Sequence, residues 1–437
     1  MSAAESIYSA LVRRNHEAEQ AMPAEVREHV PRNGLRLVLA HALQSSGDQS
    51  VNASTVLPWL FAALGVPPAL TGVLVPIRES GSMLPQAFLT PLVVRVRHRK
   101  WIFVAGALIQ AAAVAVMAAT AALAEGLAAG LIIVAALAVF SLGRCLGSIA
   151  SKDVQGRTVP KGERGQINGL STTAAGLVAV TLGLGIRLLG GEHLSPGQLA
   201  WLLAAGAALW VGVALAYASI MEPAGEPATA AQDRGENWFL ATVRLLREDK
   251  PFRNFVGVRS LLLVSSLSPP FIVTLSIQAG ADSLAGLGGF VIASGLAALI
   301  GGRLFGRFAD RSSKRLMSIG AGVASAIIIA TVAVAALTEI DGWAANIVFV
   351  AAYFSLTLMH TGVRVGRKTY VVDMADGDKR TAYVAVSNSA MGLILLIVGA
   401  ITSLLAVNHI FLALLFLAAL GLVGVFAGAR LPDVSKG

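Results

Sequence analysis

The sequence has one cysteine, few aromatic residues and no recognisable nucleotide-binding motif. Because Cys145 has no second cysteine to pair with, no intrachain disulfide can form, and no metal-ligand spacing is present. Aromatic residues make up 6% of the chain, which leaves few flat surfaces on which a sugar could stack. The missing nucleotide motif argues against an ATP-driven pump, and the missing Ser-Lys dyad and His/Asp cluster argue against an enzyme. We therefore expect no cofactor, no metal and no catalytic activity.

Long apolar stretches fill most of the 437 residues. A bilayer core of about 30 Å needs roughly 20 helical residues to cross it. Twelve stretches reach that length, at 35–64, 69–94, 101–123, 127–150, 167–189, 199–220, 254–279, 284–308, 316–337, 343–372, 383–407 and 410–429. Only helices and closed barrels satisfy the backbone in lipid, and these stretches lack strand alternation. The sequence predicts an all-α membrane protein with 12 transmembrane helices.

The basic residues gather in alternate gaps between these stretches. They lie after the second, fourth, sixth, eighth and tenth stretches, while the other gaps contain no Lys or Arg. By the positive-inside rule the basic gaps and both termini are cytoplasmic. The net charge of +9 then reflects topology, so we expect contact with membrane lipid and no nucleic-acid partner. The expected location is a bacterial inner (plasma) membrane.

The sequence divides into two halves that resemble each other. A shift of 216 residues places Lys152 on Lys368 and Arg164 on Arg380, and a shift of 214 places Arg97 on Arg311. Two pseudo-symmetric six-helix bundles with a linker are typical of one transporter architecture. The expected divisions are an N-terminal extension (1–33), a first bundle (34–221), a linker with a short amphipathic helix (222–252), a second bundle (253–430) and a tail (431–437). The extension lacks the apolar core of a signal peptide and is expected to lie on the membrane surface or to be partly disordered.

Three motifs resemble those of the major facilitator superfamily. Gly306-Arg307-Phe308-Ala309-Asp310-Arg311-Ser312-Ser313-Lys314-Arg315 resembles the family's G-x-x-x-D-R-x-G-R-R loop, whereas the first-half copy keeps only Arg97 and Lys100. The stretch from Arg144 to Ser148 is similar to R-x-x-Q-G without its Gln. Acidic-then-Arg pairs close two further loops. The resemblance implies a secondary transporter that works by alternating access.

The same resemblance implies a cytoplasmic gate formed by these loops. Its expected members are Gly306, Asp310, Arg311, Arg315, Asp153, Arg164, Asp373 and Arg380. Asp310 could pair with basic residues or cap a facing helix, and so hold the two bundles together in an outward-facing state. The alternative is that these charges are solvated anchors of the loops.

Charged residues at bilayer depth are costly and are read as functional by default. Asp48, Arg78, Glu79 and Arg144 fall near the middle of the first, second and fourth stretches. A carboxylate whose protonation depends on whether an Arg partner is engaged can couple transport to protons. We expect Asp48 or Glu79 to bind the proton and Arg144 or Arg78 to modulate it. The alternative is a static cluster that fixes helix packing.

Polar residues elsewhere in the stretches are candidates for substrate binding. They are Gln44, Gln49, Asn52, Arg259, Ser266, Tyr353, His360 and Asn388. Such residues also join membrane helices to one another, so packing is the alternative for each. Arg364 lies near the expected cytoplasmic interface, where snorkelling is the expected role. Pro269-Pro270 must break or kink its helix.

Together these features predict a monomeric secondary transporter of a small molecule, coupled to protons by symport or antiport. The fifth stretch lacks the Gly-Pro pair of the family's drug antiporters, which weakens a drug-efflux assignment. Two alternatives stay open. The first is a non-transporting protein of the same fold that assists membrane assembly or senses a ligand. The second is an uncoupled facilitator in which Asp48 and Glu79 are permanently paired.

Overall fold

The structure, a computed structural model, describes most of the chain. The described residues are 3–12, 14–20, 22–86, 89, 93, 95–160, 163–189, 195–224, 238–279, 284–338, 342–374 and 378–434. Within these ranges every regular element is a helix, and no strand occurs. The all-helical fold follows from a sequence whose apolar stretches satisfy their own backbone hydrogen bonds.

The first half of the protein consists of seven α-helices and one 3₁₀ turn among the described residues. They are α4 (Val30–Ser50), α5 (Val56–Ala63), η1 (Pro68–Leu70), α6 (Thr71–Met83), α8 (Lys100–Leu123), α9 (Gly126–Thr158), α10 (Arg164–Leu189) and α11 (Pro196–Ala218). The stretch 35–64, expected as one helix, is broken into α4 and α5. The backbone N–H of Ser54 donates to Asn52 Oδ1 at 2.9 Å, a local turn that competes with helix continuation.

The second half begins with α12 and ends with α19. Its helices are α12 (Trp238–Glu248), α13 (Lys250–Leu261), α14 (Val264–Leu267), α15 (Pro269–Gln278), α16 (Leu284–Leu337), α17 (Gly342–Asp373), α18 (Asp378–Asn408) and α19 (Ile410–Ala429). The proline pair at 269–270 starts α15, which is the expected break in the stretch 254–279. Two expected stretches lie within α16, which departs from helical geometry at Ser312 (φ −167°, ψ 99°).

Eight described helical segments are long and apolar enough to cross a membrane, judged by length and composition. The stretches at 167–189 and 284–308 give shorter apolar helices, Ala174–Gly185 and Leu287–Gly301. The first two stretches are divided or polar at their centres. These four less apolar segments all contribute side chains to the two cavities described below. The fold is that of a multi-pass membrane protein, and the full set of twelve crossings stays a prediction.

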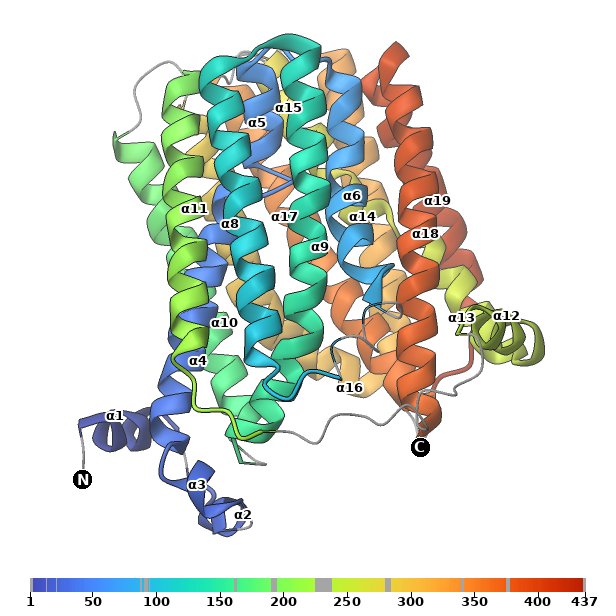
Figure 1. The fold of residues 1–437 in the computed structure, drawn as a ribbon. Coiled ribbons are helices and arrows are strands. Elements are labelled where there is room, and N and C mark those ends of the chain that lie inside the picture. The colour runs from blue at the N-terminus through green and yellow to red at the C-terminus, as the bar shows by residue number, and fades with distance from the viewer. Residues whose placement is uncertain are drawn as a thin grey trace.

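The helices form two groups that face each other (Figure 1). In the first half α8 packs against α9 and α11, and in the second half α16 packs against α17 and α19. Contacts of α10 with α16 and of α6 with α18 join the halves. Three short helices, α1 (Ala3–Leu11), α2 (His16–Gln20) and α3 (Ala24–Arg27), precede the first bundle. Figure 1 shows them with α12 and the end of α19 at one end of the bundle, here called the terminal end.

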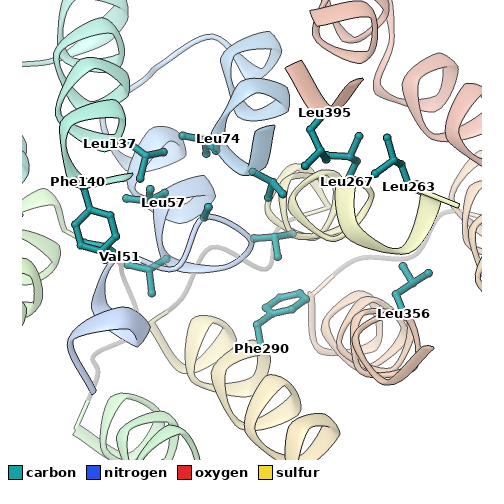
Figure 2. Packing of buried hydrophobic residues seen from close by; sticks show 14 of the residues in the cluster. Val51, Leu57, Leu74, Leu137, Phe140, Leu263, Leu267, Phe290, Leu356 and Leu395 are labelled. Carbon is teal, nitrogen blue, oxygen red and sulfur yellow. The ribbon is translucent and has the colours of Figure 1, made fainter. Parts of the chain in front are cut away.

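Buried apolar side chains close the centre of the molecule away from the terminal end. Figure 2 shows Leu57, Leu74 and Leu137 of the first half opposite Leu267 and Leu395 of the second half. The side chains of Leu57, Leu74 and Leu137 have no exposed area. This packing across the two halves removes apolar surface from solvent and holds them together at this level.

The N-terminal extension packs against the terminal end through α1 (Ala3–Leu11). The Tyr8 hydroxyl donates to Glu163 Oε2 at 2.6 Å, and the backbone N–H of Asn15 donates to Glu163 Oε1 at 2.8 Å. Tyr8 and Glu163 are both buried. Burial and the adjacent Glu163 carboxylate raise the pKa of Tyr8 well above its usual range. The extension is therefore docked on the loop before α10.

Replacing Tyr8 with Phe tests this docking. Tyr8→Phe leaves a buried Glu163 oxygen without its donor, which is expected to weaken docking by about 1–3 kcal/mol. Hydrogen exchange of the α1 amides should become faster than in the wild-type protein. The exposed neighbour Ser9→Ala is the control and should leave exchange unchanged. Equal exchange in Tyr8→Phe and Ser9→Ala would show that Glu163 does not hold α1.

A glycine on α10 permits the close approach of the two halves. A Cβ on Gly183 would lie 2.8 Å from the backbone nitrogen of Ile292 on α16, whereas a Cβ on Gly185 would meet nothing within 4 Å. Gly183→Ala is expected to lower stability by about 1–3 kcal/mol because the facing group is rigid backbone. The readout is the melting temperature of purified protein, with Gly185→Ala as the control. Identical melting temperatures for these two variants would refute the close contact.

Candidate functional site

Two adjoining cavities occupy the middle of the protein. One of them, here called the central cavity, is lined by residues from both halves and has a volume of about 710 Å³. The second, here the first-half cavity, encloses about 730 Å³ and is lined mainly by α4, α9 and α10. Gln49, Ser148, Ala298 and Arg364 line both cavities. The two spaces therefore meet where α4 and α9 face α16 and α17.

An ion cluster in the first half links three helices beside these cavities. Asp48 on α4 accepts hydrogen bonds from Arg144 Nη1 on α9, at 2.6 and 2.7 Å from its two carboxylate oxygens. Arg78 Nη2 on α6 donates to the same carboxylate at 3.0 Å. One anion is therefore shared by two cations, which leaves a net charge of +1 on three partly buried side chains. Charge-assisted bonds of this kind fix the relative positions of the helices.

The packing behind α4 directs Asp48 toward its partners. A Cβ on Gly47 would lie 2.7 Å from Nε1 of Trp210, so only glycine allows α11 to come this close. Trp210 in turn packs edge-on against Phe140 of α9, with ring centroids 5.5 Å apart. The aromatic contact occupies the side of α4 next to Asp48. The polar side of α4 consequently faces α6, α9 and the cavities.

Glu79 lies in a different environment from Asp48, although it follows Arg78 directly in sequence. Successive helical residues point about 100° apart, and Glu79 lines the central cavity while Arg78 contacts Asp48. Among the described residues none donates a hydrogen bond to the Glu79 carboxylate. The charges of Arg144 and Arg367 act on it through space. Glu79 is thus a cavity carboxylate near two cations and held by neither.

The second half contributes a buried arginine to the central cavity. Arg259 Nη1 donates to Ser387 Oγ at 2.8 Å, and Nη2 donates to Asn388 Oδ1 at 3.0 Å. Its side chain is 6% exposed. The Nε atom is buried and has no hydrogen-bond partner in the described part of the chain. Among the described residues Arg259 is therefore held by neutral groups and by no carboxylate.

Most of the sequence-predicted substrate residues meet in the central cavity. Its lining includes Gln49, Asn52, Arg259, Ser266, Tyr353, His360 and Asn388, and Gln44 lines the first-half cavity instead. Ser265 Oγ lies 3.5 Å from His360 Nδ1. Tyr353 packs edge-on against Phe290, at 5.2 Å between centroids. The polar residues that the sequence scatters over five helices thus line connected spaces.

Sequence reasoning missed two arginines and a lysine of the central cavity. Arg364, Arg367 and Lys152 all line it, although Arg364 was expected to snorkel and the others were counted with loops. A signal was present in the spacing of α17. His360, Arg364 and Arg367 follow one another at i, i+4 and i+7, which places them on one helix face. That face is turned toward the cavity.

Only part of the expected gate lies within the described side chains. Asp153 forms ion pairs with Arg99 and with Arg157 Nε, the latter at 2.9 Å, so these pairs stay within the first half. Arg315 is exposed. The structure describes only the backbone of Gly306, and the side chains of the remaining expected members, Asp310, Arg311, Arg164, Asp373 and Arg380, lie outside the described part. The gate therefore stays a prediction.

Two facing groups of helices around a polar, charged cavity define an integral multi-pass membrane protein with a transporter fold. The profile of the Major Facilitator Superfamily matches residues 37–363, which is most of the chain. The protein belongs to the Major Facilitator Superfamily.

Solved structures of transporters share this fold. The nucleoside transporter NupG is 14% identical, with a TM-score of 0.68, covering 91% of this chain and 99% of that chain. A D-xylose-proton symporter is 13% identical, with a TM-score of 0.72, covering 92% and 98%. A peptide transporter POT is also 13% identical at a TM-score of 0.72, covering 100% and 99%. No curated protein sequence matches the chain. At these identities the likeness establishes the fold alone.

The ion cluster gives a direct prediction for stability. Asp48→Asn leaves Arg78 and Arg144 partly buried without their shared anion, which is expected to cost about 3–5 kcal/mol. The melting temperature of the purified protein should fall markedly. Adding Arg144→Gln to Asp48→Asn should recover part of the loss, since it removes one uncompensated charge. An unchanged melting temperature in Asp48→Asn would show that the cluster does not stabilise the fold.

Proposed function

We propose that the protein is a proton-coupled secondary transporter that moves a small molecule by alternating access. The observation that supports this most directly is Glu79, which lies in a cavity between the two halves and whose carboxylate accepts no hydrogen bond from any described residue. Its position lets a proton and a substrate occupy one space. The family and fold support transport, and the lone carboxylate supports the coupling.

The arrangement of the halves supports an inward-facing state. Gly72 faces Ser403, and Gly399 faces Pro76, where α6 and α18 meet away from the terminal end. At the same level Gly183 faces the backbone of α16. The central cavity instead extends to Lys152 and Val371, toward the terminal end. With cytoplasmic termini, as the charge pattern predicts, the cavity faces the cytoplasm.

The surroundings of the two carboxylates favour Glu79 as the proton-binding group. Asp48 accepts three hydrogen bonds from two arginines, so a proton there must displace strong partners. No described residue donates such a bond to Glu79, and the attraction between a carboxylate and nearby cations depends on the distance between them. A movement of the halves that changes this distance would load or release the proton. Asp48 then serves as the fixed anion.

This arrangement also separates the alternatives. An uncoupled facilitator requires Glu79 to be permanently paired, and no described donor holds it. A non-transporting protein is favoured by the first-half loop, which lacks the acidic residue of the family motif. A cavity alone suits a ligand sensor as well as a transporter, and the carboxylate that no described donor holds favours the proton-coupled transporter.

We further propose twelve membrane crossings in two six-helix bundles, a monomer, and a bacterial inner-membrane location.

Glu79→Gln tests the proposed coupling. A panel of organic acids, sugars, nucleosides and peptides is first screened for a compound that raises the melting temperature of the protein. That compound, labelled, is then supplied to proteoliposomes that contain the protein. Glu79→Gln should abolish accumulation driven by a proton gradient while exchange of labelled for unlabelled compound persists. The exposed carboxylate variant Glu125→Gln is the matched control and should accumulate normally. Proton-driven accumulation by Glu79→Gln at the wild-type level would refute the role of Glu79.

A further inference from the structure

The lining of the central cavity has an excess of positive charge. Arg259 on α13 and Arg364 and Arg367 on α17 approach it from the second half, and Lys152 on α9 from the first. Among the described lining residues Glu79 is the one acidic side chain. Four basic groups therefore face one carboxylate. Counting the adjoining first-half cavity adds Asp48 and Arg144, which cancel each other and leave the excess at three.

Arg259 shows most clearly that this charge is uncompensated. Its side chain is 94% buried, since 6% of its area is exposed. Both of its hydrogen bonds end on neutral groups, and its Nε has no partner within the described residues. A buried guanidinium without a counter-charge is costly. The fold therefore retains at this point a charge that its own described residues do not neutralise.

The neighbouring arginines increase this cost. Arg259 and Arg367 repel each other as like charges, and Arg364 repels Arg367. No described carboxylate forms an ion pair with any of the three. The first half differs, because Arg78 and Arg144 both lie at hydrogen-bond distance from one carboxylate, that of Asp48. Among the described residues, the arginines of the second half have no such carboxylate partner.

We propose that the substrate is a small organic anion whose carboxylate or phosphate oxygens bind Arg259, Arg364 and Arg367. This inference rests on the proposed transport through the central cavity. The guanidinium fork matches both oxyanions and binds them through paired N–H groups. Binding an anion removes the repulsion among the arginines, which is a gain that a neutral molecule does not provide. A cationic molecule is rejected by the same charges.

Hydroxyl groups around the arginines suit the remaining polar atoms of such a molecule. Ser265, Ser266, Ser294, Thr357 and Thr361 line the same cavity. Its volume of about 710 Å³ accommodates a metabolite-sized anion. Apolar contacts come from several further side chains, among them Val75, Leu263, Met391 and Leu395. The cavity therefore suits a polyfunctional organic acid or an organic phosphate better than a long hydrocarbon chain.

The test measures equilibrium binding to the purified full-length protein in detergent. The oxyanion probes are citrate and succinate for carboxylates, and glycerol 3-phosphate and inorganic phosphate for phosphates. Glucose and uridine are the neutral comparators, and choline is the cation. At least one oxyanion is expected to bind and to raise the melting temperature, while the comparators have no effect. Binding by carboxylates alone or by phosphates alone supports the proposal and identifies the source of the oxyanion.

Variants then locate the binding site. Arg364→Gln and Arg367→Gln should each weaken oxyanion affinity by about tenfold or more, as expected when a charged donor is removed. Arg430→Gln, an exposed arginine at the end of α19, is the matched control and should keep wild-type affinity. Arg364 and Arg367 are chosen because the buried Arg259 also supports α18, so its replacement could impair folding.

Several results would overturn the proposal. The first is that no oxyanion binds the wild-type protein, and the second is that a neutral or cationic probe binds in preference. The third is that the cavity variants bind oxyanions with the same affinity as Arg430→Gln. The assay uses no proton gradient. Oxyanion binding without proton-driven uptake would therefore uphold the substrate class and refute the coupling. Proton-driven uptake of a neutral compound would uphold the coupling and refute the substrate class.

Discussion

A charge inside a membrane protein must meet an opposite charge or a full set of hydrogen-bond partners, and this constraint shapes the centre of the molecule. In the first half the constraint is met by Asp48, which binds Arg78 and Arg144 from two other helices. The pairing requires α4, α6 and α9 to approach one another closely. It depends on Gly47, behind which Trp210 packs. The ion cluster therefore fixes the positions of α4, α6 and α9 relative to one another.

The second half meets the same constraint only in part. Arg259 is buried among neutral partners, and Arg364 and Arg367 line the cavity beside it. In the proposed scheme the missing negative charge is brought by the substrate. An anion bound near Glu79 would also favour protonation of that carboxylate, because two negative charges repel each other. Binding of the anion and of the proton would then be reciprocally coupled, which is the requirement for symport.

Much of the fold could be predicted from the sequence, because lipid makes apolar length a strong signal. The stretch 101–123 differs by one residue from α8, and the stretch 410–429 coincides with α19. The break between α4 and α5 could not be predicted from hydropathy, since it depends on a turn at Asn52. The halves of α16 were expected as two helices, and the structure separates them only by the backbone at Ser312.

The candidate site was predictable where a charge stood in an apolar context. Asp48, Glu79 and Arg144 stand out for this reason, and all three line the two cavities. Arg364 and Arg367 did not, because an arginine near a helix end has the same sequence context whether it snorkels or faces a cavity. Only the packing of α17, which turns this face toward the cavity, distinguishes the two. The sequence likewise did not distinguish Asp48, which accepts hydrogen bonds from two arginines, from Glu79, because those bonds depend on tertiary contacts.

In the proposed scheme the central cavity takes up an organic anion and a proton together. The most direct measurement is calorimetry of oxyanion binding in buffers of different ionisation enthalpy, which counts the protons taken up per anion bound. Uptake of about one proton per anion is expected for the wild-type protein and almost none for Glu79→Gln. Oxyanion binding without proton uptake by the wild-type protein would contradict this scheme.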